Sequence, residues 1–488
     1  MTCLARSAAV MLLLATAAAG SALGMSDASR EVESARQLTL EEVLSSAEVS
    51  FPLLQAALLE TEVRGQLARS ASGAFDTQLS LGGDLRPMGF YENRAASVSL
   101  EQPTTFWGAR LYAKYRYGDR GVASYDGGSV TDESGEFSAG IELPLLRSGR
   151  IDRARAELRK AAIDIESLTP ELELARIDVV RDATIAYWDW VASGKIVEIT
   201  TALVEVAEAR QGQISRRVDR GSEARINLSD NQRLVVERRA RLRGAERDFR
   251  QATIILSLFL RTDEGRRIVV DASRLPPLFP PEYEIDRATL ERDLGRARDA
   301  HPQLRKLEFE REKRSVEIEV ARNDALPDLN LVLEGSRDFG RSSPGIDEVG
   351  SLSAESRSST EVKVGMRLEL PVQFRAARGR LGATRARLDQ LDRRIQYTRD
   401  QVETDVLIAF EGLSSALDQT TQARENVALA EVLRSAELRR LEAGLSNLID
   451  VNIREVQAAS AAQDLVIAQK MYFQALADYR ARVVALDG

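Results

Sequence analysis

Cysteine and histidine are almost missing from this chain. Among 488 residues there is one of each, Cys3 and His301. Zinc and related metal centres are built from several His, Cys or acidic ligands, and disulfides need pairs of cysteines. The composition therefore excludes a His/Cys metalloenzyme and a disulfide-stabilised fold, and we expect neither a metal nor a cofactor.

Aromatic residues and prolines are scarce too, at 5% of the chain and 13 residues respectively. The chain is nevertheless 44% hydrophobic and 29% charged, which is not the composition of a disordered protein. Alanine, leucine, arginine and glutamate dominate, and this favours long helices over a β-sandwich. The net charge of −8 argues against a general nucleic-acid binder, so we expect no nucleic-acid partner.

Long hydrophobic runs are confined to the N-terminus, where residues 1–24 have the pattern of a secretory signal peptide. Arg6 supplies a positive charge, residues 8–19 are apolar, and small residues follow to Gly24. An uncleaved membrane anchor is the alternative, although the apolar run is short. No other stretch reaches the ~18 apolar residues of a membrane-spanning helix. We therefore expect an exported protein that is periplasmic, secreted or an outer-membrane barrel.

The sequence contains a tandem duplication, because short motifs recur in the same order in both halves. The matched segments are 39–41 with 289–291, Leu79 with Leu329, Leu81 with Leu331, IELP at 141–144 with LELP at 368–371, and Gly221 with Gly444. The offset falls from 250 to 227 between the third and the fourth of these regions, a difference of 23 residues. The first half is therefore longer between Leu81 and Pro144.

Each half changes from a helical period to a strand period and back. Residues 39–70 and 289–323 have a helical pattern, and alternating apolar residues follow. Gly/Ser/Asp-rich segments at 118–135 and 335–360 predict exposed turns between strands. The alternating apolar positions are Phe75, Thr77, Leu79 and Leu81; those from Ala109 to Tyr117; those from Phe137 to Leu143; those from Leu329 to Leu333; and those from Val362 to Leu370.

A very long helix is predicted after each LP motif. In the second half, apolar or small residues recur at intervals of four and three from Val402 to Ala430, which is the pattern of a coiled-coil seam. Residues 376–443 would extend roughly 100 Å if they were helical throughout. A solvent-facing coiled coil would explain these helices but not the strands.

Amphipathic strands of this length suit both an outer-membrane barrel wall and a half-buried soluble sheet. Alternation alone does not separate the two. The signal peptide and the placement of strands, twice, between very long helices favour the membrane barrel. Because each half has too few strands to close a barrel and open sheet edges do not occur in lipid, this interpretation requires oligomerisation.

The arrangement resembles the TolC family of outer-membrane factors, the outer membrane efflux proteins, over nearly the whole chain after the signal peptide. Seven motifs carry the resemblance; each is weak alone, but they follow the family's order and are duplicated. They are LTLEEVLSSAEVSFPLLQAA at 38–57, IELPLLRSGR at 141–150, RRVDRGSEARINLSDNQRL at 216–234, TLERDLGRARDAHPQLRKLE at 289–308, ALPDLNLVLEG at 325–335, VGMRLELPVQF at 364–374 and RRLEAGLSNLIDVNIREVQ at 439–457.

The resemblance implies a mainly α fold with a transmembrane β-barrel. A duplicated unit of helix, strand, strand and long helical hairpin would assemble into a trimeric α/β barrel-tunnel. The linker between the repeats would pack around the waist of the tunnel. The predicted parts are the signal peptide 1–24; a first repeat 25–260 with strands within 75–144 and a helical hairpin at 150–260; the linker 261–288; and a second repeat 289–488 with strands within 325–371 and a helical hairpin at 376–486.

By the same resemblance the protein is a passive outer-membrane channel, the exit duct of a tripartite efflux pump or of a type I secretion system. Its expected partners are two further copies in a homotrimer, a periplasmic adaptor protein, an inner-membrane pump and outer-membrane lipid. Its expected location is the outer membrane, with a long extension into the periplasm.

The resemblance places the functional residues at the turns of the helical hairpins. Asp450 falls on an acidic ring at the channel entrance, and its first-half counterpart Asn227 would weaken this periplasmic gate. The alternative for Asp450 is an ordinary polar residue in a first helical turn. Ile453 stands where a second acidic ring is expected. The residues expected at the tips and in contact with the adaptor are Arg217, Val218, Gly221, Leu441, Gly444, Leu445 and Leu448.

The 23-residue excess of the first half has two explanations, an extra hairpin or an enlarged external loop. Residues 75–144 could hold four strands, with residues 103–108 as an intermediate turn. The strand count in each half must be even, because the chain returns to the side from which it entered.

Motifs that mark enzymes do not stand out. There is no phosphate loop, nucleophile elbow, zinc spacing or dinucleotide fingerprint. His301 before Pro302 indicates a helix start, and Trp188 and Trp190 indicate packing. The function hypotheses are therefore the channel first, a periplasmic structural or adaptor coiled-coil protein second, and an enzyme last. An adaptor carries one helical hairpin within β domains, whereas two equivalent halves favour the channel.

Overall fold

The computed structural model describes residues 36–88, 93–118, 131–262, 264–341 and 359–485. The predicted signal peptide at 1–24 lies outside these residues. The described residues are mainly helical with one β-sheet, as the resemblance predicts. Two compact units are present, and each takes segments from both predicted repeats. Among the described residues, unit one takes those within 36–58, 172–302 and 399–485, and unit two takes those within 59–171 and 303–398.

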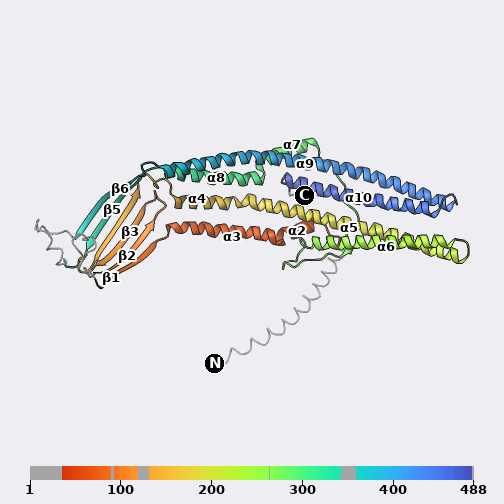
Figure 1. Ribbon diagram of the computed structural model, residues 1–488, viewed down its shortest axis with the longest axis horizontal. Helices are drawn as coiled ribbons and strands as arrows, with labels where there is room; N and C mark the ends of the chain where they lie inside the picture. Colours follow the sequence, from red (N-terminus) through yellow and green to blue (C-terminus); the bar gives the residue numbers. More distant parts are fainter. Residues whose placement is uncertain (1–35, 89–92, 119–130, 263, 342–358, 486–488) are drawn as a thin grey trace, which may run out of the picture. The chain divides into compact units, whose positions relative to one another are not determined.

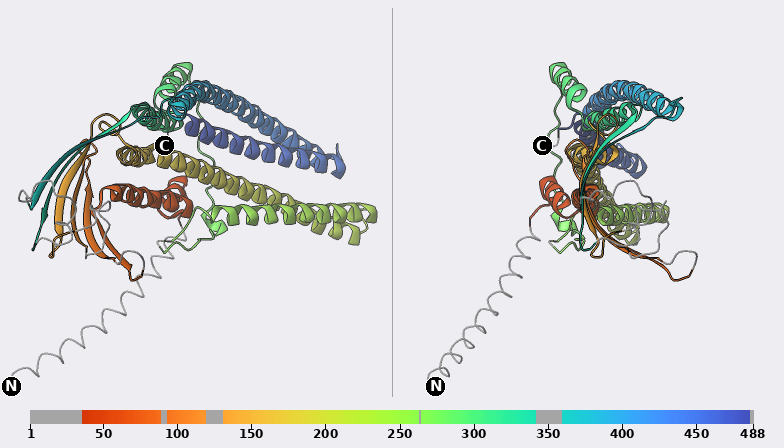
Figure 2. Two further views of the ribbon diagram at one scale, coloured as in Figure 1. Left: turned by 60° about the vertical axis from the view of Figure 1, so that its left-hand side comes forward. Right: turned by 90° about the vertical axis from the view of Figure 1, so that its left-hand side faces the viewer.

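Unit two contains a curved, six-stranded antiparallel sheet, which Figure 2 shows from two sides. Each strand pairs with its neighbours in sequence, so β1 and β6 are the edge strands and the sheet is not closed within one chain. The strands are β1 (Gln78–Arg86), β2 (Asn93–Pro103), β3 (Arg110–Gly118), β4 (Glu136–Pro144), β5 (Asp328–Asp338) and β6 (Thr360–Glu369).

One face of this sheet is apolar across all six strands. The strand registers place Leu81 beside Val98, Val98 beside Tyr115, and Tyr115 beside Phe137. These side chains are exposed, from 42% for Val98 to 74% for Leu81, so no described part of the chain buries them. The exposed residues of this apolar face include Leu79, Leu81, Leu85, Val98, Leu100, Leu111, Tyr115, Tyr117, Phe137, Leu333, Val362, Val364, Met366 and Leu368.

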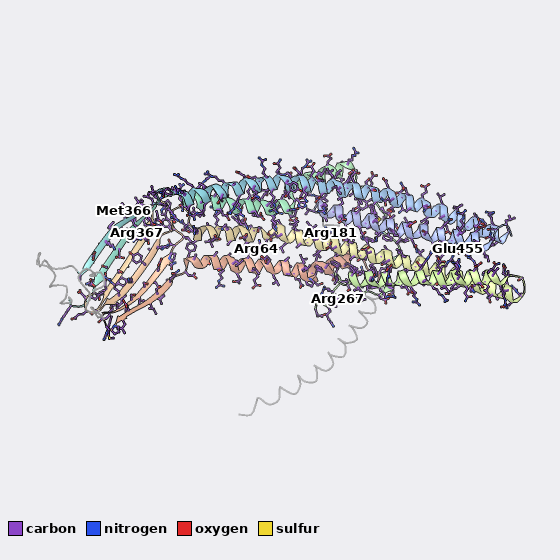
Figure 3. All side chains as sticks on the ribbon, in the orientation of Figure 1. Arg64, Arg181, Arg267, Met366, Arg367 and Glu455 are labelled. Carbon is purple, nitrogen blue, oxygen red and sulfur yellow. The ribbon has the colours of Figure 1, made fainter. Side chains whose placement is uncertain are left out.

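The opposite face is polar and its side chains interact between strands. The hydroxyl of Tyr112 on β3 donates a hydrogen bond to Glu334 on β5, at 2.6 Å. Figure 3 labels Met366 and Arg367, neighbours on β6 that belong to the apolar and the polar face respectively. Because adjacent strand residues point to opposite faces, this alternation separates the two faces at the edge strand as well.

The excess length of the first half is confirmed as an extra hairpin. β1 to β4 all lie within the predicted range 75–144, and the turn between β2 and β3 covers residues 104–109. The second half holds β5 and β6 among its described residues. The motif matches make β1 the counterpart of β5 and β4 the counterpart of β6, so the hairpin β2–β3 is the inserted part.

Two details of the strand prediction were wrong. Phe75 lies in a short 3₁₀ helix, η1 (Gly73–Phe75), where Asp76 N–H closes the turn on the Gly73 carbonyl at 3.1 Å. Residues 335–338 were predicted as a turn but belong to β5. They pair with β4 on one side and β6 on the other, and these hydrogen bonds outweigh the low strand propensity of glycine, serine and aspartate. Most of both predicted loops lies outside the described residues.

Two charged clusters brace the helices of unit two. Arg64 of α3 (Pro52–Ser72) donates to the Ser167 hydroxyl at 2.8 Å and to Glu171 at 2.6 Å, joining α3 to the junction between α4 (Arg153–Glu166) and α5 (Leu168–Asp219). Asp324 follows α8 (Pro302–Asn323), and its side chain is only 10% exposed. Its nearest cations are Arg147 at 3.7 Å, Arg153 at 3.5 Å and Arg380 at 3.7 Å.

Unit one consists of long helices around one apolar core. The buried set includes Val43, Trp190, Leu256, Val406 and Tyr472, which come from five different helices. The remaining helices are α2 (Leu40–Ser50), α6 (Arg225–Leu256), α7 (Arg287–Ala300), α9 (Arg375–Glu442) and α10 (Leu448–Arg482).

The predicted coiled-coil seam is confirmed on α9, which runs over 68 residues and begins and ends one residue before the predicted range. Val402, Val406, Leu413, Ala416 and Thr420 are all buried, at intervals of four, three or seven. Within the described parts of the chain, no helix combines the length and the apolar character that a membrane span requires.

Both repeats open with a helix pair that is interrupted before a proline. Phe51 (φ −73°, ψ 121°) separates α2 from α3, which begins at Pro52, and His301 (φ −59°, ψ 129°) separates α7 from α8, which begins at Pro302. Proline disfavours a helical conformation in the residue before it and is itself well suited to the first helical position. The helix-start interpretation of His301 is therefore confirmed.

The linker 261–288 packs on unit one through specific contacts. Arg274, 8% exposed, forms an ion pair with Glu42 of α2 at 2.7 Å. Tyr283 N–H donates to the hydroxyl of Tyr472 on α10 at 3.0 Å, and the same hydroxyl donates to the Tyr283 carbonyl at 2.7 Å. The linker is thus held to the first and the last helices of this unit.

Glu282 and Phe279 add to this attachment. Burial disfavours the ionised Glu282 carboxyl, but hydrogen bonds from Gln469 and Arg424 outweigh it and hold its pKa below the usual value. Phe279 stacks on Trp188 at 5.6 Å between ring centroids, and Trp188 stacks on Phe473 at 4.3 Å. The predicted packing role of Trp188 is confirmed.

Candidate functional site at the helical-hairpin tips

The turn between α5 and α6 is a Schellman motif centred on Gly221. Gly221 N–H donates to the Val218 carbonyl at 2.9 Å, and Ser222 N–H donates to the Arg217 carbonyl at 2.9 Å. These bonds satisfy the last carbonyls of α5 when Gly221 adopts the left-handed conformation, and its φ is +72°. The three tip residues predicted from the first copy of the motif, Arg217, Val218 and Gly221, are thus brought together with Ser222 in one turn.

The turn between α9 and α10 repeats this geometry. Gly444 N–H donates to the Leu441 carbonyl at 3.0 Å, Leu445 N–H donates to the Arg440 carbonyl at 2.8 Å, and φ of Gly444 is again +72°. Nothing lies within 4 Å of where a Cβ would stand on either glycine, so backbone conformation alone requires glycine there. Figure 1 shows both turns at the same end of unit one. We call them tip one (217–227) and tip two (440–450).

Side-chain bonds distinguish the two tips. In tip two the Asn447 side chain accepts from Ile449 N–H at 2.9 Å and from Asp450 N–H at 3.0 Å, which caps α10. Glu437, only 7% exposed, pairs with Arg440 at 3.2 Å and accepts from the Ser446 hydroxyl. In tip one the residue before α6 is Ala224, whose side chain cannot cap.

The two predicted gate residues occupy equivalent positions. Asn227 and Asp450 are each the third residue of their helix, α6 and α10. Asp450 is exposed and its carboxylate accepts from the Asn447 side-chain amide at 3.0 Å, so a side-chain bond adds to the cap that Asn447 makes to the Asp450 N–H. Asn227 is half-buried and donates to Glu223. Each side chain is held within its own tip.

The other predicted tip residues differ in exposure. Arg217 and Leu445 are exposed, Leu445 to 71%, whereas Val218, Leu441 and Leu448 are half-buried. Arg440, the counterpart of Arg217, is partly engaged with Glu437. The residues that stabilise the turns and those that face solvent are therefore neighbours in sequence.

Sequence analysis missed a pair of exposed isoleucines. Ile226 and Ile449 are the second residues of α6 and α10 and are 65% and 64% exposed. Their separation is 223 residues, the same as between Gly221 and Gly444. This offset was the signal that could have found them. Each tip thus presents an isoleucine to solvent at the same position after its reversing glycine, and tip two exposes Leu445 in addition.

Sequence analysis also missed a buried ionic network near the tips. Glu455 of α10, 4% exposed and labelled in Figure 3, pairs with Arg238 of α6 at 3.1 Å. It also pairs with Arg210 of α5, which in turn donates to Asn452. Arg238 is 1% exposed and donates a further bond to the Leu203 carbonyl at 2.8 Å. Burial lowers the pKa of the Arg238 guanidinium from its ordinary value.

The spacing of apolar residues contained the signal for this network. Asn231, Val235 and Arg238 are all buried and lie at intervals of four and three, so an arginine and an asparagine occupy seam positions of α6. On α10, Val451 and Glu455 are likewise buried and four residues apart, so a glutamate occupies a seam position there. Charged residues at seam positions need partners, and here the partners come from the other helical hairpin.

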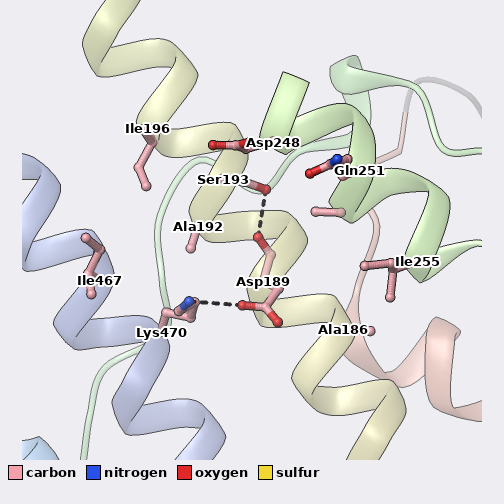
Figure 4. A pocket seen from close by; sticks show the side chains of 11 residues that line it. Ala186, Asp189, Ala192, Ser193, Ile196, Asp248, Gln251, Ile255, Ile467 and Lys470 are labelled. Atoms are coloured by element: carbon pink, nitrogen blue, oxygen red, sulfur yellow. Dashed lines mark hydrogen bonds and ion pairs between the residues drawn. The ribbon is translucent and has the colours of Figure 1, made fainter. Parts of the chain in front are cut away.

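A pocket of about 250 Å³ lies further along the same helices, between α5, α6 and α10 (Figure 4). Asp189 of α5 pairs there with Lys470 of α10 at 3.0 Å, and Ser193 donates to the Asp189 carbonyl at 2.7 Å. The other lining residues include aliphatic side chains such as Ile196 and Ile467. An ion pair between aliphatic walls makes this a gap in helix packing, and it offers no nucleophile with an adjacent base.

Comparison with known proteins identifies the fold. Residues 294–481 match the family model described as outer membrane efflux protein. A comparison with curated proteins gives no match. Among solved structures, the chain is similar to the MtrE outer membrane channel of Neisseria gonorrhoeae in its open state, with 15% identity and a TM-score of 0.63 over 92% of this chain and 89% of that one.

Two further outer-membrane proteins share this similarity. For the CmeC outer membrane channel of Campylobacter jejuni, the identity is 12% and the TM-score 0.63, over 91% of this chain and 85% of that one. For the outer membrane protein VceC of Vibrio cholerae, the identity is 14% and the TM-score 0.60, over 91% and 95%. The resemblance found in the sequence is confirmed at the level of the fold: residues 294–481 match the outer membrane efflux protein model, and the chain has the fold of these outer-membrane proteins.

Proposed function

We propose that three copies of this protein form a passive exit duct in the outer membrane, as part of a tripartite efflux pump or a type I secretion system. The sheet would stand in the membrane and the long helices in the periplasm. The signal peptide at 1–24, the two repeats at 25–260 and 289–488, and the linker at 261–288 belong to this proposal. The observation that carries it is the uncovered apolar face that crosses all six strands.

Lipid is the environment that such a sheet requires. The exposed side chains of the apolar face listed above are between 40% and 78% exposed, which in water would leave a large contiguous patch unburied. The opposite face carries charged and hydroxyl groups that suit a water-filled lumen. The backbone groups of β1 and β6 would be unsatisfied in lipid unless these strands pair with other copies.

The tips would meet a periplasmic adaptor protein joined to an inner-membrane pump. Two observations support this. Both tips have the same rigid turn, and both expose an isoleucine at the same position, Ile226 and Ile449. The contact residues proposed from sequence are Arg217, Val218, Gly221, Leu441, Gly444, Leu445 and Leu448. Energy for transport would come from the pump, since the duct itself carries out no chemical reaction.

Oligomeric state provides the first test. Protein extracted with detergent from the outer-membrane fraction should give, in native mass spectrometry, three times the mass of the processed chain, and should form channels in planar lipid bilayers. A monomer or dimer released without detergent would contradict the duct and favour a periplasmic coiled-coil protein instead.

The gate provides a second test. Three copies of Asp450 would form a carboxylate ring at the entrance, and Asn227 would contribute no charge. We expect Asp450→Asn to lower the cation selectivity of the channel and Asn227→Asp to raise it, measured as opposite shifts of the reversal potential in a salt gradient. Asp464→Asn, an exposed residue 14 positions further along α10, serves as the control. Equal shifts for Asp450→Asn and the control would remove Asp450 from the gate.

A further inference from the structure

The inserted hairpin β2–β3 lies in the middle of the sheet and leaves both edges unchanged. β2 pairs with β1 on one side, and β3 pairs with β4 on the other. In the second half the counterparts of β1 and β4 are β5 and β6, which pair with each other directly. The insertion therefore stands between β1 and β4, whose counterparts in the second repeat pair directly. It adds two strands to the sheet and leaves β1 and β6 as its edges.

The hairpin continues the wall of the sheet on both faces. Val98 of β2 and Tyr115 of β3 stand in one apolar row with Leu81 and Phe137, the residues beside them on β1 and β4. Val98 and Tyr115 are 42% and 43% exposed, close to 43% for Phe137. The hairpin thus presents the same apolar surface as the strands around it.

The turn of the hairpin is anchored to the chain that follows β4. Gly108 lies so close to this segment that an added Cβ would stand 2.5 Å from the Ser148 carbonyl oxygen. Its φ is +67°, and Trp107 before it also has a positive φ, of 51°. Trp107 in turn lies against Gly149, where a Cβ would meet its indole nitrogen at 2.8 Å. This close fit fixes the position of the turn that joins β2 to β3.

Six strands are too few to close around this polar face. The smallest barrels have about eight strands, and their interiors are filled by side chains. The polar face here includes long side chains such as Lys114, Glu334 and Arg367. The edges must therefore be completed by other copies. An even number of strands makes this possible, because β6 returns antiparallel to β1 and can pair with β1 of the next chain.

We infer that three copies of this chain form an 18-stranded barrel, in which β6 of each copy pairs with β1 of the next and β2–β3 belongs to the membrane wall. This inference rests on the proposed function for the number of copies and goes beyond it in the number of strands. Without β2–β3, three chains would give 12 strands. Since barrel diameter grows roughly linearly with strand number, the hairpin makes the barrel about 1.5 times as wide.

The edge pairing is tested by cysteine cross-linking. In a background in which Cys3 is replaced by serine, Ser80→Cys on β1 is combined, in separate variants, with Lys363→Cys, Gly365→Cys or Arg367→Cys on β6. All four positions belong to the polar face. Directly opposed residues have Cβ atoms close enough for a disulfide, so the variant in register should form a covalent trimer, three times the monomer mass on a denaturing gel. Ser80→Cys with Ser138→Cys, on the interior strand β4, should stay monomeric.

The place of the hairpin is tested by labelling single cysteines in lipid nanodiscs with a charged maleimide. Ser99→Cys and Lys114→Cys face the lumen in the inferred barrel, and their neighbours Val98→Cys and Tyr115→Cys face lipid. We expect labelling at the lipid-facing positions to be roughly tenfold slower, because hydrocarbon excludes the charged reagent. Asn330→Cys and Leu331→Cys, on the polar and apolar faces of β5, calibrate the contrast for a strand of the wall.

The outcomes separate the inference from the proposed function. Covalent trimers with equal labelling at Val98→Cys and Ser99→Cys, but contrast on β5, would place the hairpin outside the wall and overturn the 18-stranded barrel alone. A disulfide between β1 and β6 within one monomer would overturn it as well. Loss of contrast on β5, together with no cross-linked oligomer in any variant, would overturn the membrane barrel and the duct.

Discussion

The two helical-hairpin tips have the same backbone and different side-chain support. Both reverse through a glycine at φ +72° with the same pair of hydrogen bonds, and both expose an isoleucine at the second position of the next helix. Tip two adds an asparagine cap and a braced glutamate, whereas tip one has alanine at the cap position. Duplication has thus kept the turn, which depends on one residue, and has let the supporting bonds diverge.

The network around Glu455 makes the largest difference between the hairpins. Its counterpart in the first repeat, 223 residues earlier, is the uncharged Gln232, so the buried carboxylate of Glu455 has no equivalent on α6. We expect Glu455→Ala to lower the free energy of unfolding of unit one by about 3–5 kcal/mol, because Arg238 and Arg210 would lose their buried partner. Urea unfolding with hydrogen exchange on α5, α6 and α10 measures this.

An exposed ion pair serves as the control for that substitution. Glu208 pairs with Arg239 at 2.6 Å, and these side chains are 41% and 62% exposed. Glu208→Ala should change the free energy of unfolding by about 1 kcal/mol or less. Similar losses for the two alanine variants would contradict a special role for the buried network.

The shared turn predicts equal responses to glycine replacement. Gly221→Ala and Gly444→Ala should each cost about 1–2 kcal/mol, since alanine disfavours the left-handed conformation and nothing else lies near either site. Hydrogen exchange of the amides in each tip reports the local opening. A cost at one tip only would show that the turns are not equivalent.

Because only tip two has an asparagine cap, substitutions at the two cap positions should change the local stability of the tips in opposite directions. Asn447→Ala should destabilise the start of α10 by about 1 kcal/mol, and Ala224→Asn should stabilise the start of α6 by a similar amount. Combined in one protein, these variants would remove the asparagine cap from tip two and give one to tip one. The measurement is again local amide exchange, and an unchanged tip one in Ala224→Asn would mean that its backbone does not admit a cap.

The exposed isoleucines predict the smallest effect on stability and a clear effect on function. Ile226→Ser and Ile449→Ser should each change the free energy of unfolding by less than about 0.5 kcal/mol, because both side chains are already mostly in water. If they contact an adaptor, export in cells should fall while trimer yield stays constant. Normal export in the double variant would exclude these residues from the contact.

Much of this architecture could be predicted from the sequence, because it depends on residue types with narrow preferences. Gly221 and Gly444 mark the turns, prolines 52 and 302 mark the helix breaks, and alternation marks most strands. β2 has a weaker pattern, since small residues such as Ala95 and Ser97 stand between its apolar ones. The strand at 335–338 depends on pairing with β4, which no local pattern contains.

The side-chain contacts of the candidate site were less accessible to sequence reasoning for a related reason. Asp450 could be placed at a tip from the motif, but its bond to Asn447 follows from the cap geometry. Arg238 and Glu455 are 217 residues apart, and their pairing depends on how two hairpins pack. A charged residue at a seam position indicates that a partner exists without saying which residue it is.

The pairing of β4 with β5 has a consequence for the order of folding. β1 to β4 pair within about 65 residues of sequence, whereas Glu136 pairs with Asp338, 202 residues later. Contacts between such distant segments form slowly, since a long loop must close first. During synthesis, β4 is complete well before β5 exists, and its unpaired side is a site for mispairing with other chains. A chaperone that shields a four-stranded intermediate until the last two strands arrive would therefore raise the yield of the folded six-stranded sheet.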